Sequence, residues 1–125
     1  MSARILIVDD ALLIREMLRD ILVEAGFEIA GEARDGIDAL ARFRELEPDL
    51  VTLDIVMPRK SGVEALREML VVRPDARVVM CSALGQEALV EEALAAGALD
   101  FIVKPFSSEA VNSAVRRALQ EKPRS

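Results

Sequence analysis

The stretch RILIVDD at residues 4–10 carries an apolar run directly into two adjacent carboxylates, Asp9 and Asp10. Its first part has the composition of a strand buried on both faces, because aliphatic side chains follow one another without a polar break. Neither aspartate has a lysine or arginine beside it in the sequence, and the two like charges repel each other. We therefore expect a divalent cation to hold this pair.

Four more apolar runs follow, and helical patterns separate them. We expect strands at 5–8, 27–33, 49–56, 77–81 and 99–103, and helices at 12–25, 36–46, 61–72, 86–96 and from 107 to the polar end of the chain. Alternation of this kind, with near-continuous apolar strands, indicates a parallel sheet covered on both faces. The sequence thus predicts a doubly wound α/β domain over residues 1–121, with a five-stranded parallel sheet and five helices, followed by a polar tail at 122–125.

The composition limits the classes of function. The 125 residues are 52% apolar, which suits one folded domain, and the net charge of −6 disfavours nucleic acid and anionic membranes as partners. Cys81 is the only cysteine, so no intramolecular disulfide can form, as is typical of a reducing cytosol. The sequence has neither a signal-peptide pattern nor an apolar run of about 18 residues. We expect a cytoplasmic protein that binds neither nucleic acid nor membrane.

Polar residues occur where four of the expected strands end, and they are Asp9, Asp10, Asp54, Ser82 and Lys104. With the strand order 2-1-3-4-5, the three carboxylates meet at the switch point where such sheets bind ligands. Mg²⁺ suits three carboxylates, and together with the lysine it balances their charge. Asp54 can then act as the nucleophile toward a phosphoryl group, while Lys104 and Ser82 stabilise its oxygens.

Each of these residues, taken alone, has a plain structural explanation. An aspartate at a strand end is usually a cap or turn residue, Ser82 suits a helix cap, and Lys104 suits a solvated surface position. Phe101 is then a packing residue of the last strand, and Pro105 a proline at the start of a helix. The occurrence of the polar residues together, at four strand ends of one sheet, favours a functional site.

Four stretches carry a resemblance to a known family: ILIVDD, VTLDIVMPRKSG, VVMCSA and DFIVKPF. They resemble the receiver domain of two-component response regulators, which has a flavodoxin-like fold, and the likeness spans essentially the whole chain. The stand-alone length, with GEARDG and CSALGQ, is most similar to the single-domain chemotaxis members that signal to the flagellar motor. The resemblance implies a phosphorylation-activated switch that signals by protein contact and catalyses only its own phosphorylation and dephosphorylation.

Carried over by position, the resemblance implies a role for each residue of the cluster. Asp54 is the phosphoacceptor and receives its phosphoryl group from a sensor histidine kinase. Mg²⁺ binds Asp10, Asp54 and the backbone carbonyl of Val56 directly, and Asp9 mainly through a water molecule. Lys104 contacts the phosphoryl group.

The resemblance also implies a conformational switch. Ser82 moves toward the phosphoryl group and frees space for Phe101 to rotate inward, while the peptide bond before Pro105 is cis. These changes alter the surface formed by the fourth helix, the fifth strand and the fifth helix, which is expected to bind the flagellar motor switch or another protein target.

Several positions depart from the commonest pattern of the chemotaxis members, among them Ser82, which replaces the commoner threonine. Phe101 stands where those members often have tyrosine, so a partner contact that needs a phenol hydroxyl is not expected. Val56 and Leu84 flank the site with apolar side chains, and neither can orient an attacking water by hydrogen bonding. We therefore expect slow self-dephosphorylation and dependence on a separate phosphatase.

Other functions remain open at this point. A phosphohydrolase of the haloacid-dehalogenase type also uses an aspartate nucleophile and Mg²⁺, although its D-x-D motif follows the first strand. Within the receiver family, the alternatives are a stand-alone receiver or phosphorelay protein for an output other than chemotaxis, and a fragment of a larger regulator. A nucleotide-binding flavodoxin-like protein is less well supported, because both G-x-x-x-x-G-K-[ST] and G-x-G-x-x-G are missing.

Overall fold

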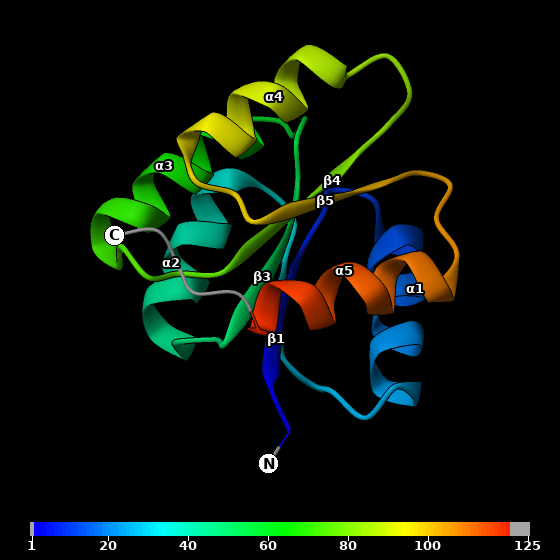
Figure 1. The fold of residues 1–125 in the computed structure, drawn as a ribbon. Coiled ribbons are helices and arrows are strands. Elements are labelled where there is room, and N and C mark those ends of the chain that lie inside the picture. The colour runs from blue at the N-terminus through cyan, green and yellow to red at the C-terminus, as the bar shows by residue number, and fades with distance from the viewer. Residues whose placement is uncertain (1, 121–125) are drawn as a thin grey trace.

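The computed structural model describes residues 2–120. Five parallel strands form its central sheet, and helices lie on either side of this sheet (Figure 1). The strands are β1 (Arg4–Val8), β2 (Glu28–Ala33), β3 (Leu50–Asp54), β4 (Val78–Ser82) and β5 (Asp100–Val103). Their order in the sheet is β2-β1-β3-β4-β5, and every neighbouring pair is parallel. The predicted fold class and strand order are confirmed. The carboxyl ends of all five strands therefore lie at one edge of the sheet.

Helices cover both faces of the sheet (Figure 1). Helices α1 (Leu12–Glu24) and α5 (Ser108–Gln120) pack on one face, and α2 (Gly36–Leu46), α3 (Gly62–Val72) and α4 (Glu87–Ala96) pack on the other. Alternate strand residues point to opposite faces, so Ile5 and Ile7 join the core beneath α1 and α5, whereas Leu6 and Val8 join the other core. This alternation also decides which polar residues meet at the end of each strand.

Local signals in the sequence fix several helix ends. The Ser61 hydroxyl accepts a hydrogen bond from the Glu64 amide at 3.2 Å, which confirms the predicted N-terminal cap of α3. Gly26 follows α1 with φ 97°, and Gly97 caps α4 with φ 124°, a backbone region that favours glycine. These glycines let the chain turn directly toward the next strand.

Two boundaries differ from the prediction in ways that matter for the site. The third strand ends at Asp54 rather than at residue 56, because Ile55 is buried as a loop residue and its apolar character resembles that of a longer strand. Ser82 is the last residue of β4 and is 1% exposed, and the N-terminal cap of α4 is Gln86. Ser82 is therefore not a helix cap.

Two further expectations concern the chain ends and membranes. The predicted polar tail at 122–125 lies outside the described residues, as does the predicted domain end at residue 121. Within residues 2–120, no helix combines the length and the apolar character that crossing a bilayer requires.

Cys81 is buried as expected, and this burial raises the pKa of its thiol to about 12. The cysteine is thus an inert core residue at physiological pH.

Candidate functional site

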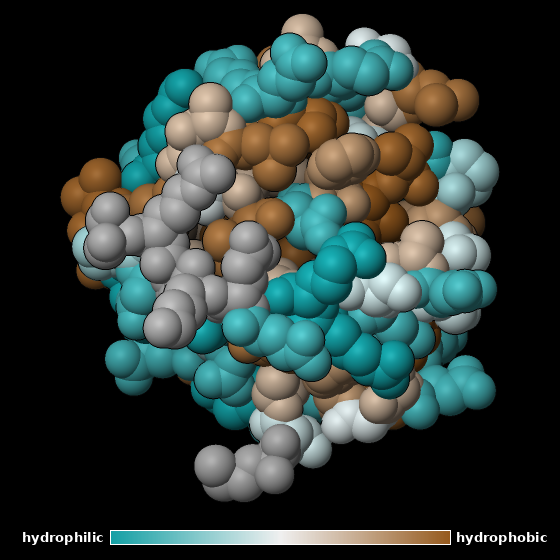
Figure 2. Space-filling model, in the orientation of Figure 1, coloured by the Kyte–Doolittle hydropathy of each residue, from teal (hydrophilic) through white to brown (hydrophobic). Residues whose placement is uncertain are grey.

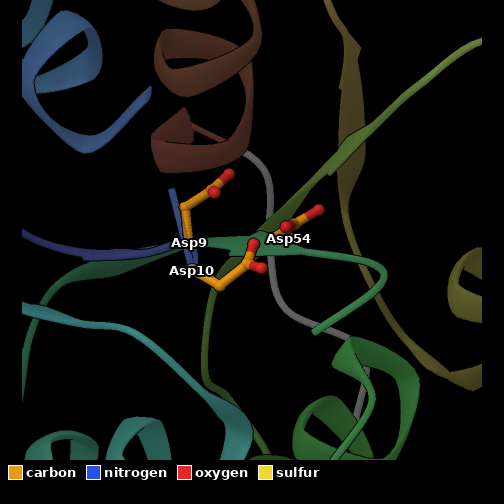
Figure 3. A group of neighbouring side chains, drawn as sticks. All are labelled: Asp9, Asp10 and Asp54. Atoms are coloured by element: carbon orange, nitrogen blue, oxygen red, sulfur yellow. The ribbon is translucent and has the colours of Figure 1, made fainter. Parts of the chain in front are cut away.

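Strand alternation brings three of the predicted site residues to the same side of the sheet. Asp9 comes two residues after Ile7 and Lys104 two residues after Ile102, both of which face α1 and α5. Asp54 ends the central strand β3 between them. Figure 3 shows the carboxyl groups of Asp9, Asp10 and Asp54 gathered at the carboxyl edge, where one oxygen of each lies within 4.8 Å of the others. The structure therefore brings the predicted acidic cluster together.

Asp9 is the most constrained member of this cluster. Its side chain is 1% exposed, and both carboxylate oxygens have protein partners. Oδ1 accepts a hydrogen bond from the Ala11 amide at 2.9 Å, and Oδ2 accepts one from Lys104 Nζ at 2.8 Å. Arg15 donates to the backbone carbonyl of Asp9 at 2.7 Å. By contrast, Asp10 is exposed to solvent.

Lys104 connects β5 to the cluster. Its Nζ lies 2.8 Å from Asp9 and 3.4 Å from Asp54, and its backbone amide donates to the carbonyl of Ser82 at 2.7 Å. Burial by itself lowers the pKa of the Lys104 ammonium, but the hydrogen bond to Asp9 and the negative charges of both aspartates outweigh it and raise this pKa. Lys104 therefore remains a fixed positive charge beside Asp54.

Asp54 has an unusually high pKa, raised to about 7. Burial of its carboxyl group is the largest cause, the charge of Asp9 adds to it, and the ammonium of Lys104 opposes both. The carboxylate form of Asp54 is thus poorly compensated by the protein alone. A further positive charge placed between the three aspartates lowers this pKa and favours the ionised form.

The donor set fits a hard divalent cation. All three side chains offer carboxylate oxygens, which Mg²⁺ prefers, and Mg²⁺ typically takes one or two carboxylates and retains several waters. Three aspartates and one lysine carry a formal charge of −2, which a divalent cation neutralises. The observed geometry of the carboxylates is therefore compatible with the magnesium site that the sequence predicts.

Ser82 and Phe101 lie on the opposite side of the sheet from this cluster. Ser82, at the end of β4, and Phe101, in β5, both line a hollow of about 330 Å³ between α4 and β5. Phe101 is 40% exposed, so its ring has open space beside it. The Lys104–Pro105 peptide bond is cis, as predicted, and α5 begins only at Ser108, so Pro105 is not a residue of that helix. Of the three predicted switch residues, Ser82 and Phe101 thus border this hollow, and Pro105 does not line it.

Gly62 is a site residue that the sequence reasoning missed. It is the first residue of α3, and a Cβ atom added to it would lie 2.1 Å from the backbone oxygen of Asp54. Only glycine permits this close approach. The dipeptide Ser61–Gly62 at a predicted helix start signals a cap, but it does not reveal that the helix packs against the aspartate backbone.

Asp35 is a second residue that was missed. As the N-terminal cap of α2, it accepts hydrogen bonds from the amides of Ile37 (3.0 Å) and Asp38 (2.8 Å), and it pairs with Arg59 at 3.2 Å. The hydrogen bond from the Asp38 amide lowers the pKa of Asp35 despite its burial, and the charge of Arg59 adds to this effect. Arg59 belongs to the loop after β3 and has φ 70°. Asp35 thus connects α2 to the loop that follows Asp54.

The sequence of this chain is similar to a known protein family and to proteins of that family over almost its whole length. The family model for the response regulator receiver domain matches residues 5–116. The chemotaxis protein CheY of Thermotoga maritima is 50% identical over 117 residues, which are 94% of this chain and 98% of the relative. The chemotaxis protein CheY of Bacillus subtilis is 50% identical over 119 residues, which are 95% and 99%.

A solved structure shows the same fold. In the CheX–CheY–BeF3–Mg complex from Borrelia burgdorferi, the matched chain is 38% identical, with a TM-score of 0.88 that covers 92% of this chain and 87% of that chain. The comparisons favour a receiver domain over the haloacid-dehalogenase alternative. The region matched by the family model contains every residue of the acidic cluster, together with Ser82, Phe101 and Lys104.

Proposed function

This chain belongs to the response regulator receiver domain family, and from that membership we propose that it is a phosphorylation-activated switch in bacterial or archaeal chemotaxis, controlled by a sensor histidine kinase. The observation that carries this proposal is the environment of Asp54. Its buried carboxyl group ends the central strand, lies within 4.8 Å of two other carboxylates and has the Lys104 ammonium 3.4 Å away.

The chemistry that this arrangement supports is transfer of a phosphoryl group to Asp54. A carboxylate oxygen of Asp54 attacks phosphorus in line with the P–N bond of a phosphohistidine. The new P–O bond forms as the P–N bond breaks. The electron pair of the P–N bond stays with the departing imidazole. The Lys104 ammonium is close enough to Asp54 to contact a phosphoryl oxygen. We assign the hydrogen bond to a second phosphoryl oxygen to the Ser82 hydroxyl, which moves toward the phosphoryl group.

We assign the cation site to Asp10, Asp54 and the backbone carbonyl of Val56, with Asp9 acting through a water molecule. Support comes from the unequal state of the two neighbours: Asp9 has both oxygens engaged by the protein, whereas Asp10 is exposed. When bound, Mg²⁺ supplies positive charge that favours the ionised form of Asp54 and accommodates the oxygens of the incoming phosphoryl group.

We further propose that the output is a protein contact made by the surface of α4, β5 and α5. Support comes from Ser82 and Phe101, which both line the hollow between α4 and β5. The Lys104 amide, which donates to the Ser82 carbonyl, connects β4 to the acidic cluster. The target is then the flagellar motor switch or another protein, and the protein acts in the cytoplasm. Its covalent chemistry is limited to its own phosphorylation and dephosphorylation, and we expect no turnover of small phosphate esters.

Intact mass measured after incubation with acetyl phosphate tests the proposal. The native chain gains one phosphoryl group with Mg²⁺ and none with a chelator, and Asp54→Ala gains none in either condition. Exposed Asp20→Ala serves as a control and gains the same mass as the native chain. A phosphoryl group on Asp54→Ala, or no gain on the native chain with Mg²⁺, would refute the assignment of Asp54.

The lifetime of the phosphorylated protein follows from the residues beside the site. Val56 and Leu84 are 51% and 79% exposed, and neither side chain can orient a water molecule toward the phosphoryl group. We expect slow loss of the phosphoryl group from the isolated protein and faster loss from Leu84→Gln, followed by mass over time. A half-life of seconds for the native chain contradicts this expectation. Slow loss of the phosphoryl group also implies that a separate phosphatase resets the switch.

A further inference from the structure

The hollow between α4 and β5, which we call the apolar hollow, has an unusual combination of surface chemistry. Figure 2 shows apolar side chains gathered between these elements, with hydrophilic side chains along the outer side of α4. Its residues are Ser82, Ala83, Leu84, Glu87, Val90, Glu91, Leu94, Phe101 and Val103. Leu84, Phe101 and Val103 are 79%, 40% and 37% exposed. This is a concentrated area of solvent-exposed apolar surface beside the switch residues.

The charge around the apolar hollow is entirely negative on the α4 side. Helix α4 reads EALVEEALAA, with three glutamates and no lysine or arginine. Glu92 pairs with Arg67 at 3.1 Å, whereas Glu87 and Glu91, which line the hollow, make no ion pair with any residue in the range 2–120. The nearby Lys104 does not compensate them, because its ammonium is engaged by Asp9 and Asp54.

From this combination we propose that the apolar hollow binds a cationic segment of the target protein, with apolar side chains inserted into the hollow and lysine or arginine residues placed against Glu87 and Glu91. The inference rests on the proposed function, in which this surface carries the output. Apolar contact supplies the affinity, and the two glutamates select the sign of charge on the partner. When the apolar side chains of the partner fill the hollow, they also reduce the exposure of Glu87 and Glu91 to water. The lower local dielectric strengthens the attraction of these glutamates to a cation.

Other occupants fit this surface less well. Nucleic acid and anionic lipid both present negative charge to Glu87 and Glu91 and are repelled. A second copy of this chain that docks through the same face in a two-fold dimer places glutamates near glutamates. A protein segment with interspersed basic residues is the occupant that satisfies both the apolar and the charged part of the hollow.

The test compares two fluorescein-labelled synthetic peptides with the same leucines and with either lysines or glutamates between them. Fluorescence anisotropy measures their binding to the full chain phosphorylated with acetyl phosphate and Mg²⁺. We expect the lysine peptide to bind at least about 10-fold more tightly than the glutamate peptide, and its affinity to fall as salt rises from about 0.05 M to about 0.5 M. A lysine peptide with serines in place of its leucines is expected to lose binding, because it cannot fill the hollow.

Matched variants separate the hollow from the overall negative charge of the protein. The pair Glu87→Gln and Glu91→Gln is expected to weaken the lysine peptide about 3- to 10-fold. The control pair, Glu24→Gln and Glu45→Gln, removes the same charge from exposed positions near the ends of α1 and α2 and is expected to leave affinity unchanged. Equal weakening by both pairs, or equal binding of the two peptides, overturns the proposal.

Four more outcomes are decisive. Failure of the lysine peptide to bind, or self-association of the phosphorylated chain through this face on size exclusion, overturns the assigned occupant. The intact mass of the same sample reports phosphorylation independently. A sample that gains its phosphoryl group but does not discriminate between peptides refutes only the assigned partner chemistry, whereas a sample that gains no phosphoryl group refutes the proposed function itself.

Discussion

Two hollows flank the acidic cluster, and they differ in how their side chains are held. The apolar hollow between α4 and β5 contains Phe101 beside open space and two glutamates that lack ion-pair partners within residues 2–120. On the other side, a hollow of about 500 Å³ is lined by Arg34, Arg42 and Arg59 together with Asp35 and Asp38, and we call it the arginine hollow. Here Asp35 pairs with Arg59 at 3.2 Å, and Arg42 lies 3.7 Å from Asp38.

Because their side chains are held so differently, the two hollows suit different roles around Asp54. In the arginine hollow, Asp35 caps α2 and holds the loop after β3, and Gly36 lies so close to that loop that a Cβ atom would be 2.6 Å from the backbone oxygen of Lys60. This side is tightly fixed and suits the positioning of cation ligands. In the apolar hollow, a half-exposed ring can move without breaking a salt bridge, which suits a surface that changes with phosphorylation.

The largest expected effect is a loss of stability, and it tests the close packing between the start of α3 and the end of β3. Gly62→Ala forces a methyl group to within 2.1 Å of the Asp54 carbonyl, so the start of α3 has to shift away from the end of β3. We expect a loss of about 3 kcal/mol in the free energy of unfolding, measured by urea denaturation. Gly85→Ala is the control: no atom lies within 4 Å of its Cβ position, and its loss should be limited to the cost of its positive φ. Similar losses for both variants would contradict the close-packing explanation.

The next largest effect comes from the acidic cluster between the two hollows, and it is the dependence of the free energy of unfolding on pH. The pKa of Asp54 is about 7 in the folded protein against an ordinary value of 3.8, so the folded state binds more protons between these pH values. Stability therefore falls as pH rises from about 4 to about 7, and it stays lower above that range. Asp54→Asn removes this penalty, so in a chelator at pH 8 we expect it to be more stable than the native chain by on the order of 2 kcal/mol.

Mg²⁺ provides the contrast for this prediction. The cation binds the native cluster more strongly than the cluster of Asp54→Asn, so adding Mg²⁺ should narrow the difference in stability at pH 8. At pH 4 the difference should also shrink, because Asp54 is then largely protonated. Parallel stability curves for the two proteins between pH 4 and pH 8 would show that Asp54 is not destabilised by its burial and by Asp9.

The sequence predicted most of this arrangement, for identifiable physical reasons. Strand β1 is an apolar run followed directly by Asp9, and the mostly apolar β3 ends on Asp54, so the sequence predicted both the strands and their polar ends. Neither Gly62 nor Asp35 could be predicted in this way, because their importance lies in contacts across the fold: one with the Asp54 backbone and one with Arg59. The end of β3 was placed two residues late, since Ile55 is buried equally well as a loop residue.

A smaller effect distinguishes the two contributions of Asp35. Asp35→Ala removes both the cap of α2 and the partner of Arg59, and we expect a loss of about 1.5 kcal/mol by urea denaturation. Asp35→Asn keeps an oxygen that can accept from the helix amides but loses the charge, so it should retain more than half of this stability. Equal losses for both variants would assign the effect to the ion pair, even though Arg59 is largely exposed.

The smallest effect tests the apolar hollow, where stability should hardly respond at all. Leu84 is 79% exposed, so Leu84→Ser removes little buried surface and should change the free energy of unfolding by less than about 0.5 kcal/mol. The same substitution should weaken the lysine peptide, because Leu84 contributes to the wall that the peptide contacts. A variant with normal stability and weakened peptide binding would mean that this apolar surface serves recognition. A large loss of stability would instead show that Leu84 supports the fold, and that the two hollows differ less than their contacts indicate.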